Sequence, residues 1–182
     1  MRNTMLGMLG ALMCVLAACA KVVPVQDFDL EKMAGKWYIV GLATNAKWFV
    51  NNKAVMKTTT AMLVPTGGDL NLTYANLNAD GSCWRTTQLA NKTDTPGHFS
   101  FHSHIWNNDN DMQIVDVAYD EYALVYTVKT QESVSEVLTQ LYSRTPEVTL
   151  VLQQKFTQFS LENGALPDNV VILSQNGECP LV

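Results

Sequence analysis

Eight short runs of β-forming residues, separated by clusters of turn-forming residues, limit the fold more than any other feature of this sequence. The runs cover residues 37–44, 54–64, 70–77, 83–90, 98–103, 112–119, 122–128 and 139–144. The separators, such as "PTGGD" (65–69) and "NADGS" (78–82), are rich in residues that make tight turns. Evenly spaced strands with short turns favour an up-and-down antiparallel sheet, and eight strands can close into a barrel. We therefore expect an all-β fold, an eight-stranded antiparallel β-barrel.

One amphipathic helix is expected after the barrel strands. Thr145 is a suitable N-cap, Pro146 suits the first helical position, and Glu147 suits the positive end of the helix dipole. Apolar residues then recur every three or four positions: Val148, Val151, Leu152, Phe156 and Phe159. Gly164 is a suitable C-terminal cap, and a last short strand is expected at 169–174. Such a helix is expected to pack its apolar face on the outer wall of the barrel.

The first twenty residues have the pattern of a secretory signal peptide. Arg2 precedes an apolar run from Met5 to Leu16, and Ala18-x-Ala20 is a suitable cleavage site. The run is shorter than the roughly 20 apolar residues that span a bilayer. We expect a signal peptide at 1–20, one domain at 21–182, and a secreted, extracellular protein without a stable membrane anchor. The alternative is a bacterial lipoprotein signal, "LAAC" (16–19), with Cys19 lipidated.

Removal of the signal peptide leaves two cysteines, Cys83 and Cys179, out of four. Two cysteines in an exported protein most simply form one disulfide, and two free thiols are the alternative. The sequons at Asn71 and Asn91 are candidate glycosylation sites. The formal net charge of −5 argues against a nucleic-acid partner, because phosphate binding requires an excess of Lys and Arg.

An eight-stranded barrel can enclose one small ligand or be filled by its own side chains, and the sequence leaves both options open. Two polar clusters are candidates for other chemistry. His98, His102 and His104 have the spacing of metal ligands but lie in a predicted strand without an evident fourth ligand, so solvated histidines are favoured and no metal is expected. Asp116, Asp120 and Glu121 flank a predicted hairpin turn, which favours solvated carboxylates over acid–base catalysis.

Trp37 on the first strand and Arg144 on the last form a candidate structural pair. The first and last strands of a closed barrel are neighbours, so the guanidinium can lie over the indole. We expect this contact to close one end of the barrel.

Several of these elements together resemble the lipocalin family. They are "GKWY" (35–38), "VDVAYDEYALVY" (115–126), "LYSRT" (141–145), the pair of cysteines Cys83 and Cys179, and the single helix near the C-terminus. Within the family, "GLATNAKW" (41–48) and "GGDLNLT" (67–73) are similar to the lipocalin-type prostaglandin D synthases. The resemblance implies a barrel open at one mouth that binds retinoids, fatty acids, bile pigments or similar molecules.

In the synthases, one cysteine on the second strand isomerises a prostaglandin endoperoxide with a thiol. The resemblance places that position at Thr59, inside "KTTTA" (57–61), a segment without cysteine. A hydroxyl is far less acidic than a thiol, and no general base is evident beside it. We therefore expect no catalytic residue and no cofactor, and prostaglandin-H2 D-isomerase activity is the alternative.

Strand alternation and the resemblance together nominate a ligand-binding set. If Thr59 points inward, Val55, Lys57 and Ala61 do so too. The full set is Ile39, Trp48, Val55, Lys57, Thr59, Ala61, Leu72, Tyr74, Phe99, Phe101, Trp106 and Tyr142, with Trp48 and Trp106 in mouth loops. Lys57 either pairs with a ligand carboxylate or lies solvated near the rim. The expected partner is a small hydrophobic molecule bound to a monomer; a siderophore or a cell-surface receptor is a further option.

Overall fold

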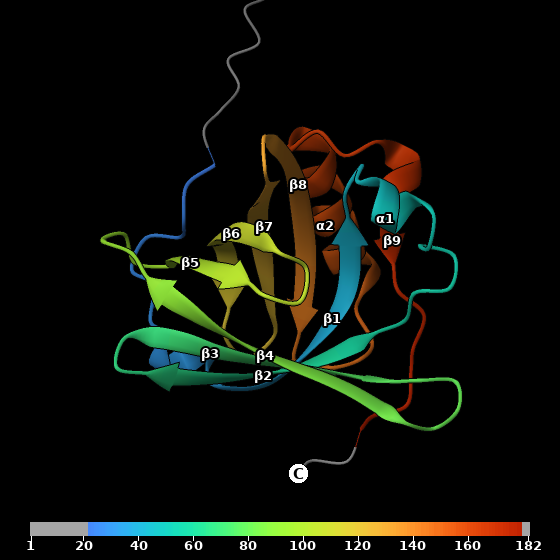
Figure 1. The fold of residues 1–182 in the computed structure, drawn as a ribbon, viewed down its shortest axis with the longest axis horizontal. Helices are drawn as coiled ribbons and strands as arrows, with labels where there is room; N and C mark the ends of the chain where they lie inside the picture. The colour runs from blue at the N-terminus through green and yellow to red at the C-terminus, as the bar shows by residue number, and fades with distance from the viewer. Residues whose placement is uncertain (1–21, 180–182) are drawn as a thin grey trace, which may run out of the picture.

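The computed structural model describes residues 22–179, and the predicted signal peptide lies outside them. Eight antiparallel strands close into a barrel (Figure 1). They are β1 (Gly35–Ala43), β2 (Thr59–Thr66), β3 (Asp69–Leu77), β4 (Cys83–Lys92), β5 (His98–Ser103), β6 (Asn108–Ala118), β7 (Tyr122–Gln131) and β8 (Val134–Ser143). Each strand pairs with the next, and β1 pairs with both β2 and β8. The predicted eight-stranded up-and-down barrel is confirmed.

Three of the predicted strand boundaries are wrong by four or five residues. The second strand begins at Thr59 instead of residue 54, because residues 47–50 form the short helix α1 (Lys47–Val50) and a turn follows it. Strand β6 begins at Asn108 and β8 at Val134, before their predicted starts at 112 and 139. The Asn- and Asp-rich segment "NNDND" (107–111) therefore extends a strand over most of its length instead of forming a turn.

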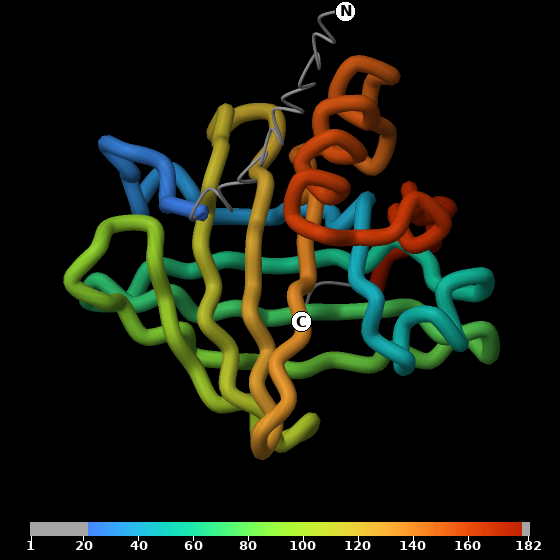
Figure 2. Tube along the Cα trace, turned by 90° about the horizontal axis from the view of Figure 1, so that it is seen from above, coloured from blue at the N-terminus to red at the C-terminus, as the bar shows by residue number. Residues whose placement is uncertain are grey.

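Helix α2 (Leu150–Glu162) lies on the outside of the barrel, as predicted (Figure 2). Its N-cap is Thr149, whose side chain accepts a hydrogen bond of 3.2 Å from the Leu152 amide, so the prediction of Thr145 as N-cap is wrong. Leu152 and Phe156 are buried against β1 and β8, whereas Val151 is exposed. Gly41 permits this packing, because a Cβ there would lie 2.8 Å from the Phe156 ring. Gly164 follows the last turn with a φ of +89°, which favours glycine.

The C-terminal segment is tied to the barrel in two places. After the 3₁₀ turn η2 (Pro167–Asn169), strand β9 (Val170–Ile172) pairs with the end of β1, where β1 has separated from β2. Cys179 then forms the predicted disulfide with Cys83 at the start of β4. No helix among residues 22–179 is long and apolar enough to cross a membrane.

Trp37 and Arg144 meet at one end of the barrel. The guanidinium carbon of Arg144 lies 3.7 Å from the centroid of the Trp37 ring. The same guanidinium donates hydrogen bonds to the carbonyls of Tyr119, Lys36 and Lys32, at 2.8–3.0 Å. Another 3₁₀ turn, η1 (Glu31–Met33), places Met33 under the indole, whose N–H donates to the Met33 carbonyl at 2.8 Å. This cluster closes the barrel at the end opposite the mouth.

Candidate functional site

The open half of the barrel contains a cavity of about 1190 Å³. The closed half is filled by a buried cluster of apolar side chains, including Met33, Leu63, Leu70 and Ile114. The barrel is therefore only partly filled, which resolves the choice that the sequence left open. The volume lies above the range of about 300–1,000 Å³ usual for small-molecule pockets.

The predicted ligand-binding residues divide into three groups. Ile39, Trp48, Thr59, Tyr74, Phe101 and Trp106 line the cavity. Ala61, Leu72, Phe99 and Tyr142 belong to the buried cluster beneath it. Val55 and Lys57 lie outside the lining and are exposed. The expectation that every second residue counted from Thr59 points inward does not hold for Val55 and Lys57, because both precede the start of β2 and do not belong to a strand.

Thr59 faces the cavity at the first position of β2. It is opposite Ile39 of β1, which is in turn opposite Tyr142 of β8. The Tyr142 hydroxyl lies 3.2 Å from that of Tyr74, and burial raises the pKa of both phenols. This floor of the cavity therefore carries neutral hydroxyl groups. Residues 22–179 contain two cysteines, Cys83 and Cys179, and neither of them lines the cavity.

Lys129 is the main lining residue that the sequence did not predict. It lies on β7, and its Nζ donates a hydrogen bond of 2.7 Å to Oδ1 of Asn110 on β6. The same Nζ lies 5.6 Å from the centroid of the Trp106 ring. Burial lowers the pKa of Lys129 to about 8, against the opposing effect of the Glu136 carboxylate. Lys129 is thus a cation held inside a largely uncharged cavity at neutral pH.

The strand pattern explains why Lys129 was missed. The predicted strand ended at residue 128, but β7 continues to Gln131 and keeps its alternation past that point. Val125 is a core residue, and Thr127 and Lys129 line the cavity. Extending the alternation by one residue would have found this lysine.

Aromatic and charged side chains surround the mouth. Trp84 on β4 and Trp106 after β5 have ring centroids 6.1 Å apart. They lie where β4 and β5 separate, since these two strands share only two residue pairs, both near the closed end. The charged lining residues are Lys47, Lys129, Glu132 and Glu136, so positive and negative side chains are equal in number.

The histidines lie on the outer wall, away from the cavity lining. His98 contacts Asp111, and Nδ1 of His102 lies 2.8 Å from Oδ1 of Asp109. The sequence missed both carboxylates because they belong to the part of β6 that was predicted as a turn. Within residues 22–179, no three His, Cys, Asp or Glu side chains group as metal ligands.

The acidic residues of the β6–β7 hairpin also lie away from the cavity lining. Asp120 and Glu121 are exposed in the turn, as predicted. Asp116, in contrast, pairs with Lys155 of α2 at 2.5 Å. This carboxylate therefore ties the helix to the barrel wall.

The two sequons lie on neighbouring strands. Asn71 is half-buried on β3, and Asn91 is exposed on β4. Of the two amides, that of Asn91 is the more accessible.

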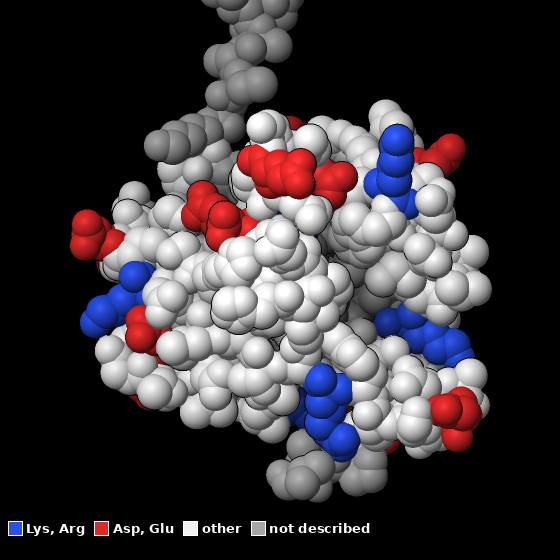
Figure 3. Space-filling model, in the orientation of Figure 1, with Lys and Arg blue, Asp and Glu red and all other residues white. Residues whose placement is uncertain are grey.

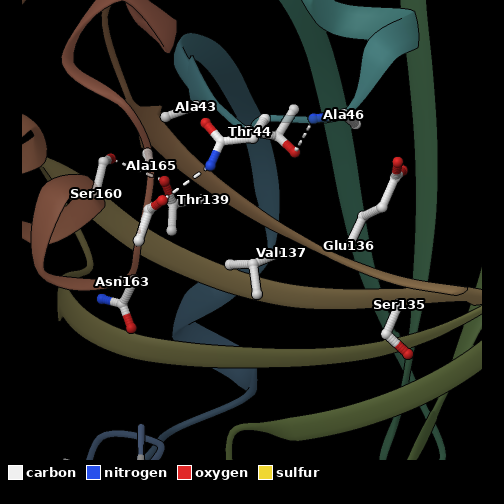
Figure 4. A pocket seen from close by; sticks show the side chains of 12 residues that line it. Ala43, Thr44, Ala46, Ser135, Glu136, Val137, Thr139, Ser160, Asn163 and Ala165 are labelled. Atoms are coloured by element: carbon white, nitrogen blue, oxygen red, sulfur yellow. Dashed lines mark hydrogen bonds between the residues drawn. The ribbon is translucent and has the colours of Figure 1, made fainter. Parts of the chain in front are cut away.

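A smaller pocket of about 280 Å³ lies outside the barrel, between α2, β8 and the start of the β1–β2 loop (Figure 4). Thr139 and Ser160 face each other there, with their hydroxyl oxygens 2.8 Å apart. The Asn45 side chain donates to the Gly164 carbonyl at 2.9 Å. Glu136 points away from this hydroxyl pair (Figure 4). These bonds join the end of α2 to the barrel wall, so the pocket belongs to the packing of the helix.

Comparisons with known proteins agree with this architecture. A "Lipocalin" of Rhinella marina is 35% identical over 174 residues, which cover 93% of each chain. A "Prostaglandin-H2 D-isomerase" of Canis lupus familiaris is 34% identical over 177 residues, covering 96% of this chain and 91% of the relative. A solved structure described as "The Siderocalin Ex-FABP functions through dual ligand specificities" has a TM-score of 0.71 and 26% identity, over 83% of this chain and 99% of the other. The model of the lipocalin / cytosolic fatty-acid binding protein family matches residues 34–177, and the chain belongs to that family.

Proposed function

We propose that this protein is a secreted carrier of small hydrophobic molecules that bear one carboxylate, such as fatty acids or retinoic acid. The single observation that carries the proposal is Lys129, an ammonium inside a large cavity lined mainly by uncharged side chains. Burial of the apolar part of a ligand supplies affinity of about 25 cal/mol per Å². The ligand carboxylate can in addition pair with the Lys129 ammonium, an interaction that a neutral ligand does not make.

The carrier function is favoured over isomerase activity by the chemistry of the cavity. Several relatives carry the name "Prostaglandin-H2 D-isomerase", which supports that activity as the second candidate. The position that the resemblance assigns to the nucleophilic cysteine is Thr59, and both cysteines of the described chain are joined in a disulfide. Because no cysteine of residues 22–179 lines the cavity, the described part of the chain offers no thiolate nucleophile for the isomerisation.

A strongly anionic ligand such as a siderophore is less well matched. Such a ligand requires an excess of positive charge, but the lining holds two lysines and two glutamates. Two further basic residues near the barrel mouth, Lys57 and Arg85, are exposed and do not line the cavity.

Secretion is part of the proposal and has its own test. The signal-peptide pattern at 1–20 and the disulfide both suit an oxidising, extracellular environment. Expression in a secreting host is expected to yield a protein in the medium that begins at Lys21. Retention of residues 1–20 in the mature protein would contradict this part of the proposal.

Two assays separate carrier from enzyme. In a fluorescence-quenching titration, at least one of retinoic acid, a long-chain fatty acid and a bile pigment is expected to bind with a Kd below about 10 μM. In a thiol-dependent assay with prostaglandin H2, turnover is expected to equal the background without protein. Turnover well above background would establish the isomerase instead, whereas failure of the whole ligand panel would overturn the carrier.

A further inference from the structure

The rim of the cavity carries large apolar side chains that the barrel leaves exposed. They are Trp48, Val50 and Val55 of the β1–β2 loop, Trp84, Ile105, Trp106 and Val134. Trp48, Trp84, Trp106 and Val134 also line the cavity, so this apolar surface surrounds its opening. We propose that this mouth surface docks reversibly on an anionic lipid membrane, with the β1–β2 loop (44–58) making the main contact.

The β1–β2 loop differs in charge from the β7–β8 turn on the other side of the mouth. Residues 44–58 contain Lys47, Lys53 and Lys57 and no acidic residue. The β7–β8 turn across the mouth carries Glu132. In Figure 3, basic side chains lie over the right side of this face, where α1 and the loop run in Figure 1, with acidic side chains beside them at the right edge; acidic side chains also lie over the upper part of the face, and further basic ones at its left and lower edges. The loop thus gives a net positive edge to a chain of net charge −5.

Apolar and basic groups alternate along the loop in a way that suits a lipid headgroup layer. Trp48 follows Lys47 directly, and Val55 lies two residues before the exposed Lys57, whereas the half-buried Lys53 donates hydrogen bonds to the Asp168 carbonyl and the Asn169 side chain. Indole rings favour the boundary between hydrocarbon and water, and lysines are attracted to anionic headgroups. Val55, with 76% of its surface exposed, is placed to enter the acyl boundary while Lys57 stays at headgroup level.

The opposite end of the barrel does not have these properties. Acidic residues outnumber basic ones there: Asp27, Asp29 and Glu31 before β1 and Asp120 and Glu121 between β6 and β7 lie near Lys32, which pairs with Asp29, and Arg144. Repulsion of this end from an anionic surface would orient the mouth toward the bilayer. This orientation needs no ligand in the cavity, so the proposal does not depend on the proposed carrier function.

Flotation with lipid vesicles tests the proposal. The purified protein is mixed with vesicles of phosphatidylcholine alone, or of phosphatidylcholine with phosphatidylserine at about 30 mol%. It is expected to float with the anionic vesicles and not with the neutral ones. Because salt screens this electrostatic attraction, the bound fraction is expected to decrease as the salt concentration is raised from about 0.05 M to about 0.5 M. Absence of binding to anionic vesicles at low salt would overturn the proposal.

Matched variants locate the contact. Val55→Ser is expected to lower vesicle affinity about three- to tenfold, whereas Val151→Ser, at an equally exposed valine on α2, leaves it unchanged. Lys57→Glu is expected to lower the affinity for anionic vesicles about tenfold. Lys32→Glu, at the closed end of the barrel, is expected to leave that affinity unchanged. Neither Val55 nor Lys57 lines the cavity, and far-UV circular dichroism with thermal unfolding provides the folding control. Equal loss in the paired variants would refute docking through this loop.

Discussion

Nζ of Lys129 donates a hydrogen bond of 2.7 Å to Oδ1 of Asn110, across neighbouring strands inside the barrel. Asn110 is buried, and its amide nitrogen donates in turn to the Asn108 side chain at 2.8 Å. This chain of bonds fixes the orientation of the Asn110 amide, so the ammonium has a defined position on the cavity wall. The electrostatic character of the cavity depends on this one pair more than on any residue of β2.

Replacing Lys129 with methionine is expected to separate acidic from neutral ligands. Lys129→Met removes the charge and keeps most of the side-chain volume, so retinoic acid is expected to bind about tenfold more weakly while retinol is little affected. Lys57→Met is the matched control, because Lys57 lies outside the cavity lining. Fluorescence titration of both ligands measures the effect. An equal loss for acid and alcohol would show that Lys129 contributes packing alone.

The affinity for a carboxylate ligand is expected to fall as the pH rises above about 8. The pKa of Lys129 is about 8 in the free protein, and a bound carboxylate raises that pKa by favouring the ammonium. The complex therefore holds its proton more strongly, and affinity is constant below pH 8 and declines by up to about tenfold per pH unit above it. Titrations between about pH 6.5 and 9.5 measure this. A decline of the same size for retinol, or in Lys129→Met, would contradict the assignment.

The Trp37–Arg144 contact is expected to stabilise the closed end. Arg144→Ala removes the guanidinium from the indole and leaves three backbone carbonyls without their donor. We expect a loss of about 2–3 kcal/mol in the free energy of unfolding, measured by urea denaturation. Arg144→Lys keeps the charge but cannot reach all three carbonyls, so it is expected to recover less than half of the loss. Wild-type stability of Arg144→Ala would show that the contact is energetically neutral.

The Cys83–Cys179 disulfide is expected to stabilise the fold without shaping the cavity. The two cysteines are 96 residues apart, and closing so long a loop restricts the unfolded chain by about 4–5 kcal/mol on the chain-entropy account. The double variant Cys83→Ser/Cys179→Ser is expected to lose stability of this order and to keep its ligand affinity under native conditions, because neither residue lines the cavity. A large fall in affinity at a temperature where the variant is folded would contradict this separation.

The sequence predicts the fold well because its turn residues and apolar runs are local. Strand number, order and the late helix all follow from them. The predicted element boundaries are wrong where the same local residues are compatible with two structures. Thr145 and Thr149 both suit an N-cap, and only the second bonds the first turn of α2. Asn108 and Asn110 belong to residue types that favour turns, yet in β6 they face a cavity that only the closed barrel creates.

The ligand-binding set shows the same limit. Ile39, Thr59 and Tyr74 line the cavity, and each lies within a strand, where alternation applies. Alternation could not be carried from Thr59 back to Lys57, since the strand ends between them. The buried lysine of the cavity is instead Lys129, on a strand whose predicted end at residue 128 lay three residues before its observed end at Gln131. Alternation carried past residue 128 would have placed Lys129 on the inner face, but the burial of its ammonium depends on the assembled barrel.

Native mass spectrometry of the protein secreted by a eukaryotic cell provides the decisive test of the carrier function. We expect a one-to-one complex with a lipophilic carboxylate, which organic extraction releases and the emptied protein binds again. We further expect that retinoic acid displaces the natural ligand more readily than retinol does, and that this difference disappears in Lys129→Met. A protein that carries no lipophilic molecule, and that accepts neither ligand after extraction, would contradict the carrier function.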